Sequence, residues 1–262
     1  MSVFHFKQFD VANERSSMKV NTDGVILGAA ATLSASDRRV LDAGTGTGTI
    51  ALMLAQRYHS AGVPCPSSPL ATGAGMPTDS ALAIVGIDID APSAAEAGVN
   101  FSISRWAGVL EARHCALRDY FPEEPLDLIV SNPPYYDDSL LPPEARRGIA
   151  RHTGGAALSF ANLADFSREH LRSAGRLSVI LPADQERNVR RYAVSCGLYP
   201  FRILRIRTTP RKEVSRIVLE FGLLPCDTID DSTLTIQDPA SWPDNKNGYT
   251  PKYLALTGDF YL

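Results

Sequence analysis

The amino-acid sequence predicts an α/β fold built on an open, mostly parallel sheet of seven strands, with helices on both faces and an antiparallel strand pair at the C-terminal end. Two observations support this prediction. Strand-like and helix-like segments alternate between residues 40 and 196, and two further strand-like segments then follow each other with only a loop between them.

The strand candidates are short apolar runs, and the helix candidates show a helical pattern. Residues 40–43 (VLDA) end at glycines, as a buried strand does, whereas residues 49–58 (TIALMLAQRY) are typical of a helix. The expected strands are residues 40–43, 82–89, 111–115, 126–131, 176–181, 201–207 and 215–221. The expected helices are residues 49–58, 92–106, 157–171 and 184–196, with Asp184 as a cap and Gly197 as the end of the last one.

The length of 262 residues suits a single domain that comprises residues 1–262. Residues 1–35 form its N-terminal segment. Residues 59–80 are expected to be a flexible surface insertion, because they are rich in Ser, Pro, Gly and Ala and lack periodicity. The net charge of −3 means that a nucleic-acid partner would need a local basic face. The oligomeric state stays open, and a monomer is compatible with the sequence.

The cysteine pattern excludes several kinds of site. Cys65, Cys115, Cys196 and Cys226 are far apart and form no C-x-x-C pair, so we expect no metal site. Scattered thiols fit a reducing compartment. The first ten residues lack the apolar core of a signal peptide, and no uncharged apolar run reaches the length of a membrane span. A cytoplasmic protein without a membrane partner is therefore expected.

A glycine-rich turn, residues 42–48 (DAGTGTG), joins the first strand to the first helix. Glycines permit a tight turn and a close approach of the backbone to a ligand, and the helix start offers N–H groups to an anion. The glycine spacing is G-x-G-x-G rather than the G-x-G-x-x-G of dinucleotide-binding proteins. Together with Asp42, which precedes Gly44 and Gly46, it favours S-adenosylmethionine, whose cationic amino acid end suits a carboxylate. A tight turn without a ligand is the alternative.

Acidic residues follow the next two strands. Asp88, with Ile89 beside it, ends the second strand and can accept hydrogen bonds from both ribose hydroxyls of a cofactor. Asp90 lies on the same face of the strand, so periodicity does not choose between the two carboxylates. We assign Asp88 to the ribose and Asp90 to the cap of the following helix. Asp119, with Tyr120, follows the third strand and is expected to bind the adenine amino group of the cofactor; an ordinary loop aspartate is the alternative.

The motif Asn132-Pro133-Pro134-Tyr135 closes the fourth strand. Two prolines stop the strand and stiffen the turn. The side-chain oxygen of Asn132 and the carbonyl of Pro133 can accept both hydrogens of a planar –NH2 group, which aims the nitrogen lone pair at a methyl donor. Tyr135 can stack on the flat group that carries this nitrogen. A rigid turn with a capping Asn is the structural alternative, but the carboxyl edge of such a sheet is where ligands bind.

Together these residues resemble the Rossmann-like class I methyltransferases, and residues 132–135 match the NPPY signature of enzymes that methylate amino nitrogens. Residues 4–9 (FHFKQF) and 18–29 (MKVNTDGVILGA) resemble the N-terminal signature of the bacterial valine-tRNA adenine-37 N6-methyltransferases. Further similarity lies in residues 131–136, 150–153 and 260–262. The resemblance covers nearly the whole chain. It implies methyl transfer from S-adenosyl-L-methionine to N6 of adenine 37, next to the anticodon of a valine tRNA.

The resemblance also implies roles for individual residues. It implies that the cofactor is contacted by Asp42, Gly44, Gly46, Asp88 and Asp119. The cofactor pocket would be shaped by Lys19, Thr22, Asp23 and Gly24. The target adenine would be held by Asn132, Pro133 and Tyr135. The chain departs from the family pattern at Ser16 and Ser17, where a pair with a cysteine is common. It departs again at residues 59–80, which are longer than the usual connection in the family.

A tRNA partner requires positive charge, because phosphates are held by lysines and arginines. The second half of the chain has a basic stretch that comprises Arg187, Arg190, Arg191, Arg202, Arg205, Arg207, Arg211, Lys212 and Arg216. Single arginines usually belong to solvated faces. The group just after the reaction motif, Arg146, Arg147 and Arg151, is therefore the better candidate for RNA contact. A loop base needs less unstacking than a duplex base, which suits a chain without a separate DNA-reading domain.

Other functions are compatible with the reaction motif alone. The NPPY signature is shared with enzymes that methylate DNA, rRNA or a protein glutamine amide, so another nucleic-acid adenine and a glutamine side chain are alternative acceptors. A non-catalytic RNA-binding or cofactor-sensing module belongs to a different class. The intact turn at Gly44 and Gly46, together with the intact motif from Asn132 to Tyr135, argues against that module.

Overall fold

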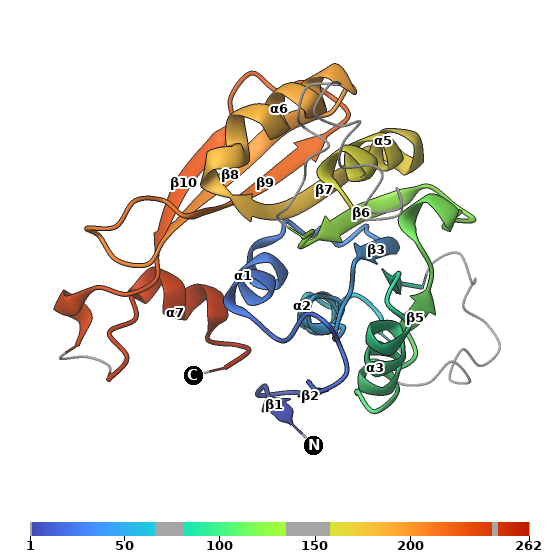
Figure 1. Cartoon of the computed structure of the whole chain (residues 1–262), viewed down its shortest axis with the longest axis horizontal. Helices are drawn as coiled ribbons and strands as arrows, with labels where there is room; N and C mark the ends of the chain where they lie inside the picture. The colour runs from blue at the N-terminus through green and yellow to red at the C-terminus, as the bar shows by residue number, and fades with distance from the viewer. Residues whose placement is uncertain (1, 66–80, 135–157, 243–245, 262) are drawn as a thin grey trace, which may run out of the picture.

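An eight-stranded sheet forms the centre of the computed structural model, which describes residues 2–65, 81–134, 158–242 and 246–261 (Figure 1). The strand order is β10-β8-β9-β7-β6-β3-β4-β5. The strands are β3 (Arg39–Ala43), β4 (Ala83–Asp88), β5 (Leu110–His114), β6 (Leu126–Ser131), β7 (Leu171–Pro182), β8 (Tyr199–Arg207), β9 (Arg216–Gly222) and β10 (Asp230–Thr235). β3 to β7 are parallel, whereas β9 runs antiparallel to β7 and β8.

The seven predicted strands are all present, and the mostly parallel sheet with an antiparallel β8–β9 pair is confirmed. The eighth strand, β10, was not predicted. It pairs in parallel with β8 at the edge of the sheet, and Leu234 is its one buried residue. A mostly polar edge strand lacks the apolar run that marks a buried strand, so only its pairing with β8 reveals it.

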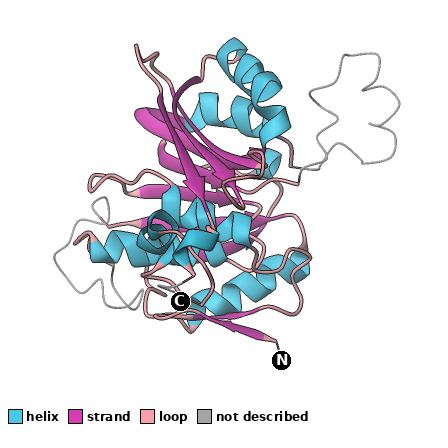
Figure 2. Ribbon diagram, turned by 90° about the vertical axis from the view of Figure 1, so that its left-hand side faces the viewer, coloured by secondary structure: helices cyan, strands magenta, loops and turns pink. Residues whose placement is uncertain are grey.

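Helices cover both faces of the sheet, as Figures 1 and 2 show. They are α1 (Thr22–Ala30), α2 (Thr49–Ser60), α3 (Ala91–Ser102), α5 (Phe160–His170), α6 (Glu186–Ser195) and α7 (Pro251–Thr257). Val40 and Leu128 belong to the buried cluster with α1, α2, α3 and α7, whereas Leu41 and Ile129 belong to the cluster with α5 and α6. Successive residues of one strand thus serve opposite faces. In the described ranges, no helix combines the length and the apolar character that crossing a membrane requires.

The N-terminal segment contains structure that the sequence pattern did not reveal. Residues Val3–His5 (β1) and Asp10–Ala12 (β2) form an antiparallel hairpin, and α1 follows it. The side chain of Asn21 accepts the N–H of Gly24 at 2.8 Å and so caps α1. Every residue of α1 from Gly24 onward is buried. A helix that is buried on all sides lacks the one-sided periodicity of a surface helix, which explains why it was missed.

Two local predictions were wrong, and one is confirmed. Asp184 does not cap α6: it lies in the 3-10 turn Ala183–Gln185, and the helix begins after Gln185 without a side-chain cap. The predicted insertion at residues 59–80 begins too early, because α2 continues to Ser60, and residues 66–80 lie outside the described part. Gly197 does follow the end of α6, where its φ of +79° suits glycine.

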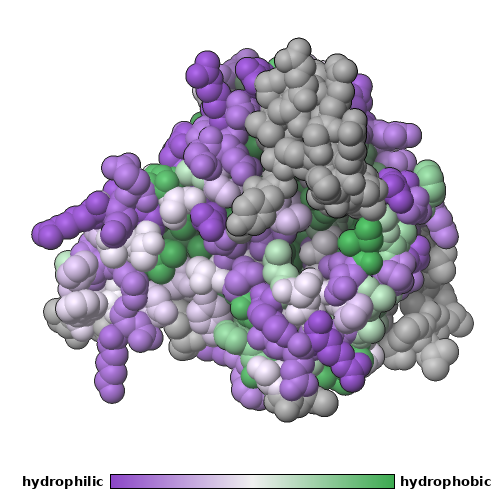
Figure 3. Space-filling view, in the orientation of Figure 1, coloured by the Kyte–Doolittle hydropathy of each residue, from purple (hydrophilic) through white to green (hydrophobic). Residues whose placement is uncertain are grey.

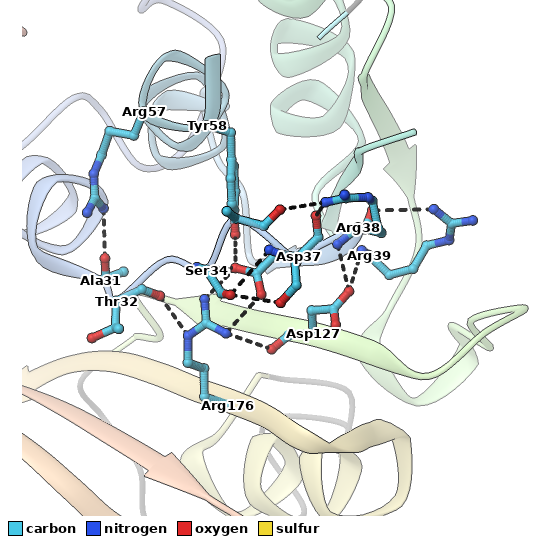
Figure 4. A network of polar contacts seen from close by, with 12 residues as sticks. Ala31, Thr32, Ser34, Asp37, Arg38, Arg39, Arg57, Tyr58, Asp127 and Arg176 are labelled. Atoms are coloured by element: carbon cyan, nitrogen blue, oxygen red, sulfur yellow. Dashed lines mark hydrogen bonds and ion pairs between the residues drawn. The ribbon is translucent and has the colours of Figure 1, made fainter. Parts of the chain in front are cut away.

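A buried polar network ties the amino ends of the central strands together (Figure 4). Arg176 of β7 donates to the carbonyl of Thr32 at 2.7 Å and to the carboxylate of Asp37 at 3.0 Å. The hydroxyl of Tyr58 donates to the same carboxylate at 2.6 Å. Burial raises the pKa of Asp37, but the hydrogen bonds from Arg176 and Tyr58 outweigh burial and lower it. Because this network takes up the amino edge of the sheet, we expect the functional site at the opposite, carboxyl edge.

Candidate active site

A cavity of about 240 Å³ lies at the carboxyl ends of β3 to β6. Gly44, Asp88 and Asn132 line it, so the turn after β3, the end of β4 and the end of β6 meet there. A smaller cavity adjoins it and shares Met18, Gly44 and Asn132 with it. The parallel direction of the strands explains this meeting, because their carboxyl ends reach the same edge of the sheet.

The glycine-rich turn adopts a backbone that side chains disfavour. Gly44, Gly46 and Gly48 have φ values of +75°, +56° and +81°. A Cβ atom on Gly44 would lie 2.8 Å from Leu158, and one on Gly48 would lie 2.4 Å from Phe101. The N–H groups of Gly44 and Thr45 both donate to the carbonyl of Ile87 at 2.9 Å. Only glycine therefore allows the turn to pack against β4 and to leave room for a ligand above it.

Asp42 lies fully buried at the base of this turn, outside the lining of both cavities. Its Oδ2 accepts the hydroxyl of Thr45 at 2.7 Å and the N–H of Ala51 at 3.3 Å. Its Oδ1 is buried and has no hydrogen-bond partner among the described residues. Burial raises the pKa of Asp42 to about 7. A buried carboxylate with one unpartnered oxygen fits a cationic group such as the ammonium of S-adenosylmethionine.

The two carboxylates after β4 have different partners. Asp90 caps α3: it accepts the N–H of Ser93 at 3.0 Å and the hydroxyl of Ser93 at 2.6 Å. Asp88 accepts the N–H of Gly46 at 2.9 Å through Oδ2 and the N–H of Asp90 at 2.9 Å through Oδ1. Each carboxylate oxygen has a second lone pair. Asp88, which is half-buried in the cavity lining with exposed Ile89, is thus able to accept ribose hydroxyls as well.

The segment after β5 contributes to the cavity through residues that the sequence patterns did not single out. Cys115, Ala116 and Leu117 line the cavity. Asp119 ends the 3-10 turn that Leu117 begins, and its exposed carboxylate lies 3.5 Å from the guanidinium of Arg118, outside the lining.

Tyr120 lies elsewhere. Its ring is buried at a second cavity, which Arg113 and Phe121 also line, and the guanidinium carbon of Arg113 lies 5.8 Å from the ring centroid. The structure therefore separates Tyr120 from the cavity that contains Gly44 and Asp88.

The reaction motif follows β6 directly. Ser131 donates its hydroxyl to the carbonyl of Ala43 at 2.7 Å, which holds the end of β6 beside the start of the glycine-rich turn. Asn132 and Pro134 line the main cavity, and Pro133 is buried between them. Tyr135, Arg146, Arg147 and Arg151 lie outside the described residues.

The N-terminal candidate residues differ in whether they line a cavity. Lys19 and Gly24 line the smaller cavity, whereas Thr22 and Asp23 do not line either one. Asp23 instead forms an ion pair with Arg216 of β9 at 2.8 Å. Ser17 and Met18, which the sequence did not indicate as site residues, line the main cavity. Among the described residues, no group of three or more His, Cys, Asp or Glu side chains is placed to hold a metal ion.

Known proteins resemble this chain in sequence and in fold. No protein-family model matches it. A relative from Flavobacterium johnsoniae is 34% identical over 262 residues, with 99% of both chains covered. A relative from Phocaeicola vulgatus is 37% identical over 261 residues, with 99% of this chain and 97% of the relative covered. Both relatives are named tRNA1(Val) (adenine(37)-N6)-methyltransferase. The structure of a predicted O-methyltransferase from Agrobacterium tumefaciens matches with a TM-score of 0.60 at 16% identity, covering 91% of this chain and 96% of that one.

Proposed function

Since the chain belongs to the family of tRNA1(Val) (adenine(37)-N6)-methyltransferases, we propose that it transfers a methyl group from S-adenosyl-L-methionine to N6 of adenine 37 in a valine tRNA. Its fold is that of the class I methyltransferases. The observation that supports the proposal is the meeting of Asn132 with Gly44 and Asp88 in one cavity, because a hydrogen-bond acceptor for an amino group then shares this space with the residues proposed to bind the cofactor. A tRNA substrate implies a cytoplasmic location.

The residues around the cavity suit the separate parts of the cofactor. The turn at Gly44 and Gly46 would receive its amino acid end, with the carboxylate of Asp42 balancing the ammonium. Asp88 would accept the ribose hydroxyls. The apolar side chains of Ile89 and Leu117 would contact the adenine ring.

Several cofactor contacts in this proposal are less direct. Asp119 is the candidate for the adenine amino group, since it ends the turn whose first residue lines the cavity. Lys19 and Gly24 would contact the amino acid end of the cofactor from the side of the smaller cavity. Thr22 and Asp23 would support Gly24 through the first turn of α1 rather than touch the cofactor.

The reaction motif would align the target nitrogen. The Asn132 side-chain oxygen and the Pro133 carbonyl accept the two hydrogens of the adenine amino group, and Tyr135 stacks on the base. The cofactor supplies a methyl group on a sulfonium ion. N6 would take up this methyl group through its lone pair and would release one of its two hydrogens to water as a proton. No strong base is needed, because the methylated nitrogen is acidic while it is cationic.

The structure sorts the basic stretch of the second half into paired and unpaired side chains. Arg202 contacts Glu220 at 2.6 Å, and Arg205 contacts Glu186 at 2.6 Å and Asp231 at 2.9 Å. The neighbouring carboxylates offset the charge of both arginines, so little net positive charge is available there to attract phosphates. They are poor candidates for RNA contact.

Other cations of this stretch lie exposed at the carboxyl edge of the sheet. β8 is parallel to β7, so its end and the loop with Arg211 and Lys212 lie at this edge. The N–H of Ala183 donates to the carbonyl of Ser215 at 3.2 Å, which places this loop beside the turn that follows β7. Arg187 is exposed just after that turn. Among the described residues, none of these three cations forms an ion pair.

We infer that Arg187, Arg211 and Lys212 contact tRNA phosphates, together with Arg146, Arg147 and Arg151. Exposed Asp184 and Glu213 lie among the three described cations and reduce their net charge. The face of the molecule in Figure 3 is predominantly hydrophilic, with apolar residues in small separate groups.

The acceptor is tested by incubating the chain with radiolabelled cofactor and with unmodified tRNA or candidate proteins. We expect label in valine tRNA, N6-methyladenosine in its nucleosides by mass spectrometry, and no label in a matched transcript with guanine at position 37. Label in protein and none in tRNA would overturn the proposed acceptor in favour of a glutamine amide. Label in the position-37 variant would move the target to another adenine.

A further inference from the structure

The side chain of Met18 lies against the reaction motif. The Nδ2 atom of Asn132 is 3.6 Å from the Sδ atom of Met18, which is within hydrogen-bonding reach of sulfur. Both residues line the main cavity and the smaller cavity that adjoins it. Met18 therefore occupies the junction between the glycine-rich turn and the reaction motif, at the point where a cofactor and a target base would meet.

The segment that carries Met18 is held by α3. The carboxylate of Glu96, which is 4% exposed, accepts the backbone N–H groups of Glu14, Arg15 and Ser16, each at 2.8 Å. These bonds outweigh the effect of burial and lower the pKa of Glu96. A carboxylate that accepts several backbone N–H groups keeps its charge and fixes the chain that it binds.

Further contacts extend this attachment in both directions along the segment. Asn100 of α3 exchanges hydrogen bonds with the backbone of Ala12, at 2.8 Å and 3.1 Å. The hydroxyl of Ser16 donates to the carbonyl of Met18 at 2.9 Å and lies 3.1 Å from the hydroxyl of Ser93. The position of Met18 is thus set by α3, whose N-cap follows the ribose candidate Asp88.

The chemistry of a thioether determines which end of the Asn132 amide faces it. A thioether sulfur is a weak acceptor and has no hydrogen to donate. The amide nitrogen is consequently favoured on the side of Met18, and the amide oxygen is turned away from it. The mechanism needs this oxygen as an acceptor for the adenine amino group. The reversed amide would present a donor to that amino group and would repel its hydrogens.

We propose that Met18 is a positioning residue for methyl transfer: it accepts from Nδ2 of Asn132 and so directs Oδ1 toward the target amino group. The proposal rests on the proposed function, since it assigns a role to Met18 in the same reaction. The proposal also explains the attachment of the segment to Glu96, because a mobile segment would not keep the sulfur of Met18 beside the amide of Asn132. The role is distinct from shaping the cavity, for which any apolar side chain of this size suffices.

The decisive variant is Met18→Leu, which keeps the apolar volume and removes the acceptor. We expect kcat on tRNA to fall by about 3- to 10-fold, the range of one modest hydrogen bond, with KM for the cofactor unchanged within about twofold. Met18→Ala serves as the packing control and should raise KM for the cofactor as well. A Met18→Leu variant with wild-type kcat would overturn the proposal, as would a loss that appears only in KM.

A second measurement reads the amide without any turnover. The side-chain NH2 signals of Asn132 are assigned by NMR through their disappearance in Asn132→Ala. They should shift in Met18→Leu and stay in place in Arg15→Gln, a change on the same segment at an exposed residue that lines neither cavity. Unshifted signals in Met18→Leu would overturn the contact. A wild-type chain that leaves tRNA unmethylated would instead overturn the proposed function, and the NH2 signals would still decide whether Met18 accepts from Asn132.

Discussion

Asp88, at the end of β4, accepts the backbone N–H of Gly46 in the turn after β3 at 2.9 Å. One carboxylate thus joins the two loops that the cofactor is expected to contact. Burial raises the pKa of Asp88, and the hydrogen bonds from Asp90 and Gly46 counteract this effect. The carboxylate is in this way positioned before any ligand arrives.

Replacing this carboxylate should weaken cofactor binding. In Asp88→Ala, the proposed ribose acceptor is removed and Gly46 loses its partner, so the dissociation constant for S-adenosylmethionine should rise by about 10- to 100-fold in calorimetry. Asp90→Ala is the matched control. It removes the cap of α3 and should cost about 1 kcal/mol of stability with a much smaller effect on affinity. Equal losses of affinity in both variants would contradict the assignment of the ribose to Asp88.

Replacing Asn132 should separate binding from turnover. Asn132→Ala removes one of the two proposed acceptors of the amino hydrogens, so we expect kcat on tRNA to fall by roughly 100-fold or more. Cofactor affinity should change by only a few-fold, because the proposed cofactor contacts lie mainly in the turn after β3 and the ends of β4 and β5. Single-turnover assays and calorimetry measure the two effects. Full activity of the variant would exclude the mechanism.

Reversing charge in the β8–β9 loop should weaken RNA binding selectively. The double change Arg211→Glu and Lys212→Glu should raise KM for tRNA by about tenfold or more and reduce its salt dependence, with cofactor affinity unchanged. Arg105→Glu is the control, since Arg105 is also exposed but precedes β5, at the amino edge of the sheet. A similar effect of Arg105→Glu would show that general charge, not this loop, governs binding.

Asp42 should give stability a pH dependence of unusual sign. Its pKa is about 7 in the folded chain against 3.8 for a free carboxyl, because burial disfavours its charge. The folded state therefore holds a proton that the unfolded state has lost between these values, and stability falls as pH rises from about 4 to 7. In urea unfolding, the free energy of unfolding of Asp42→Asn relative to that of the wild type should increase over this range, by at most on the order of 4 kcal/mol. An advantage that is constant with pH would show that Asp42 is charged throughout.

The network at the amino edge should control stability. Arg176→Met leaves the buried carboxylate of Asp37 without its cation and should cost about 3–5 kcal/mol in the free energy of unfolding. Adding Asp37→Asn should recover much of the loss, because the unpaired charge is then removed. Denaturant titrations of the two single variants and the double variant measure this coupling. Additive losses in the double variant would mean that the ion pair contributes little.

The sequence determined most of the sheet and the outline of the candidate site. Strands such as residues 126–131 are apolar runs buried on both faces, and such runs are visible in the local pattern. The parallel arrangement then brings the residues after these strands to one edge. For this reason Gly44, Asp88 and Asn132 were predicted as neighbours although 88 positions separate the first from the last, and the structure places them in one cavity.

Only the tertiary structure decided which side chains act on one another across the fold. The contact between Met18 and Asn132, the hold of Glu96 on residues 14–16, and the pairing of Arg205 with Glu186 and Asp231 all join segments whose spacing has no periodic signature. The same limit hid α1, which is buried on every side, and β10, which is polar. Local patterns indicate which face of an element is buried. The partners of a side chain depend instead on how distant elements pack together, and this packing has no signature in the neighbouring residues.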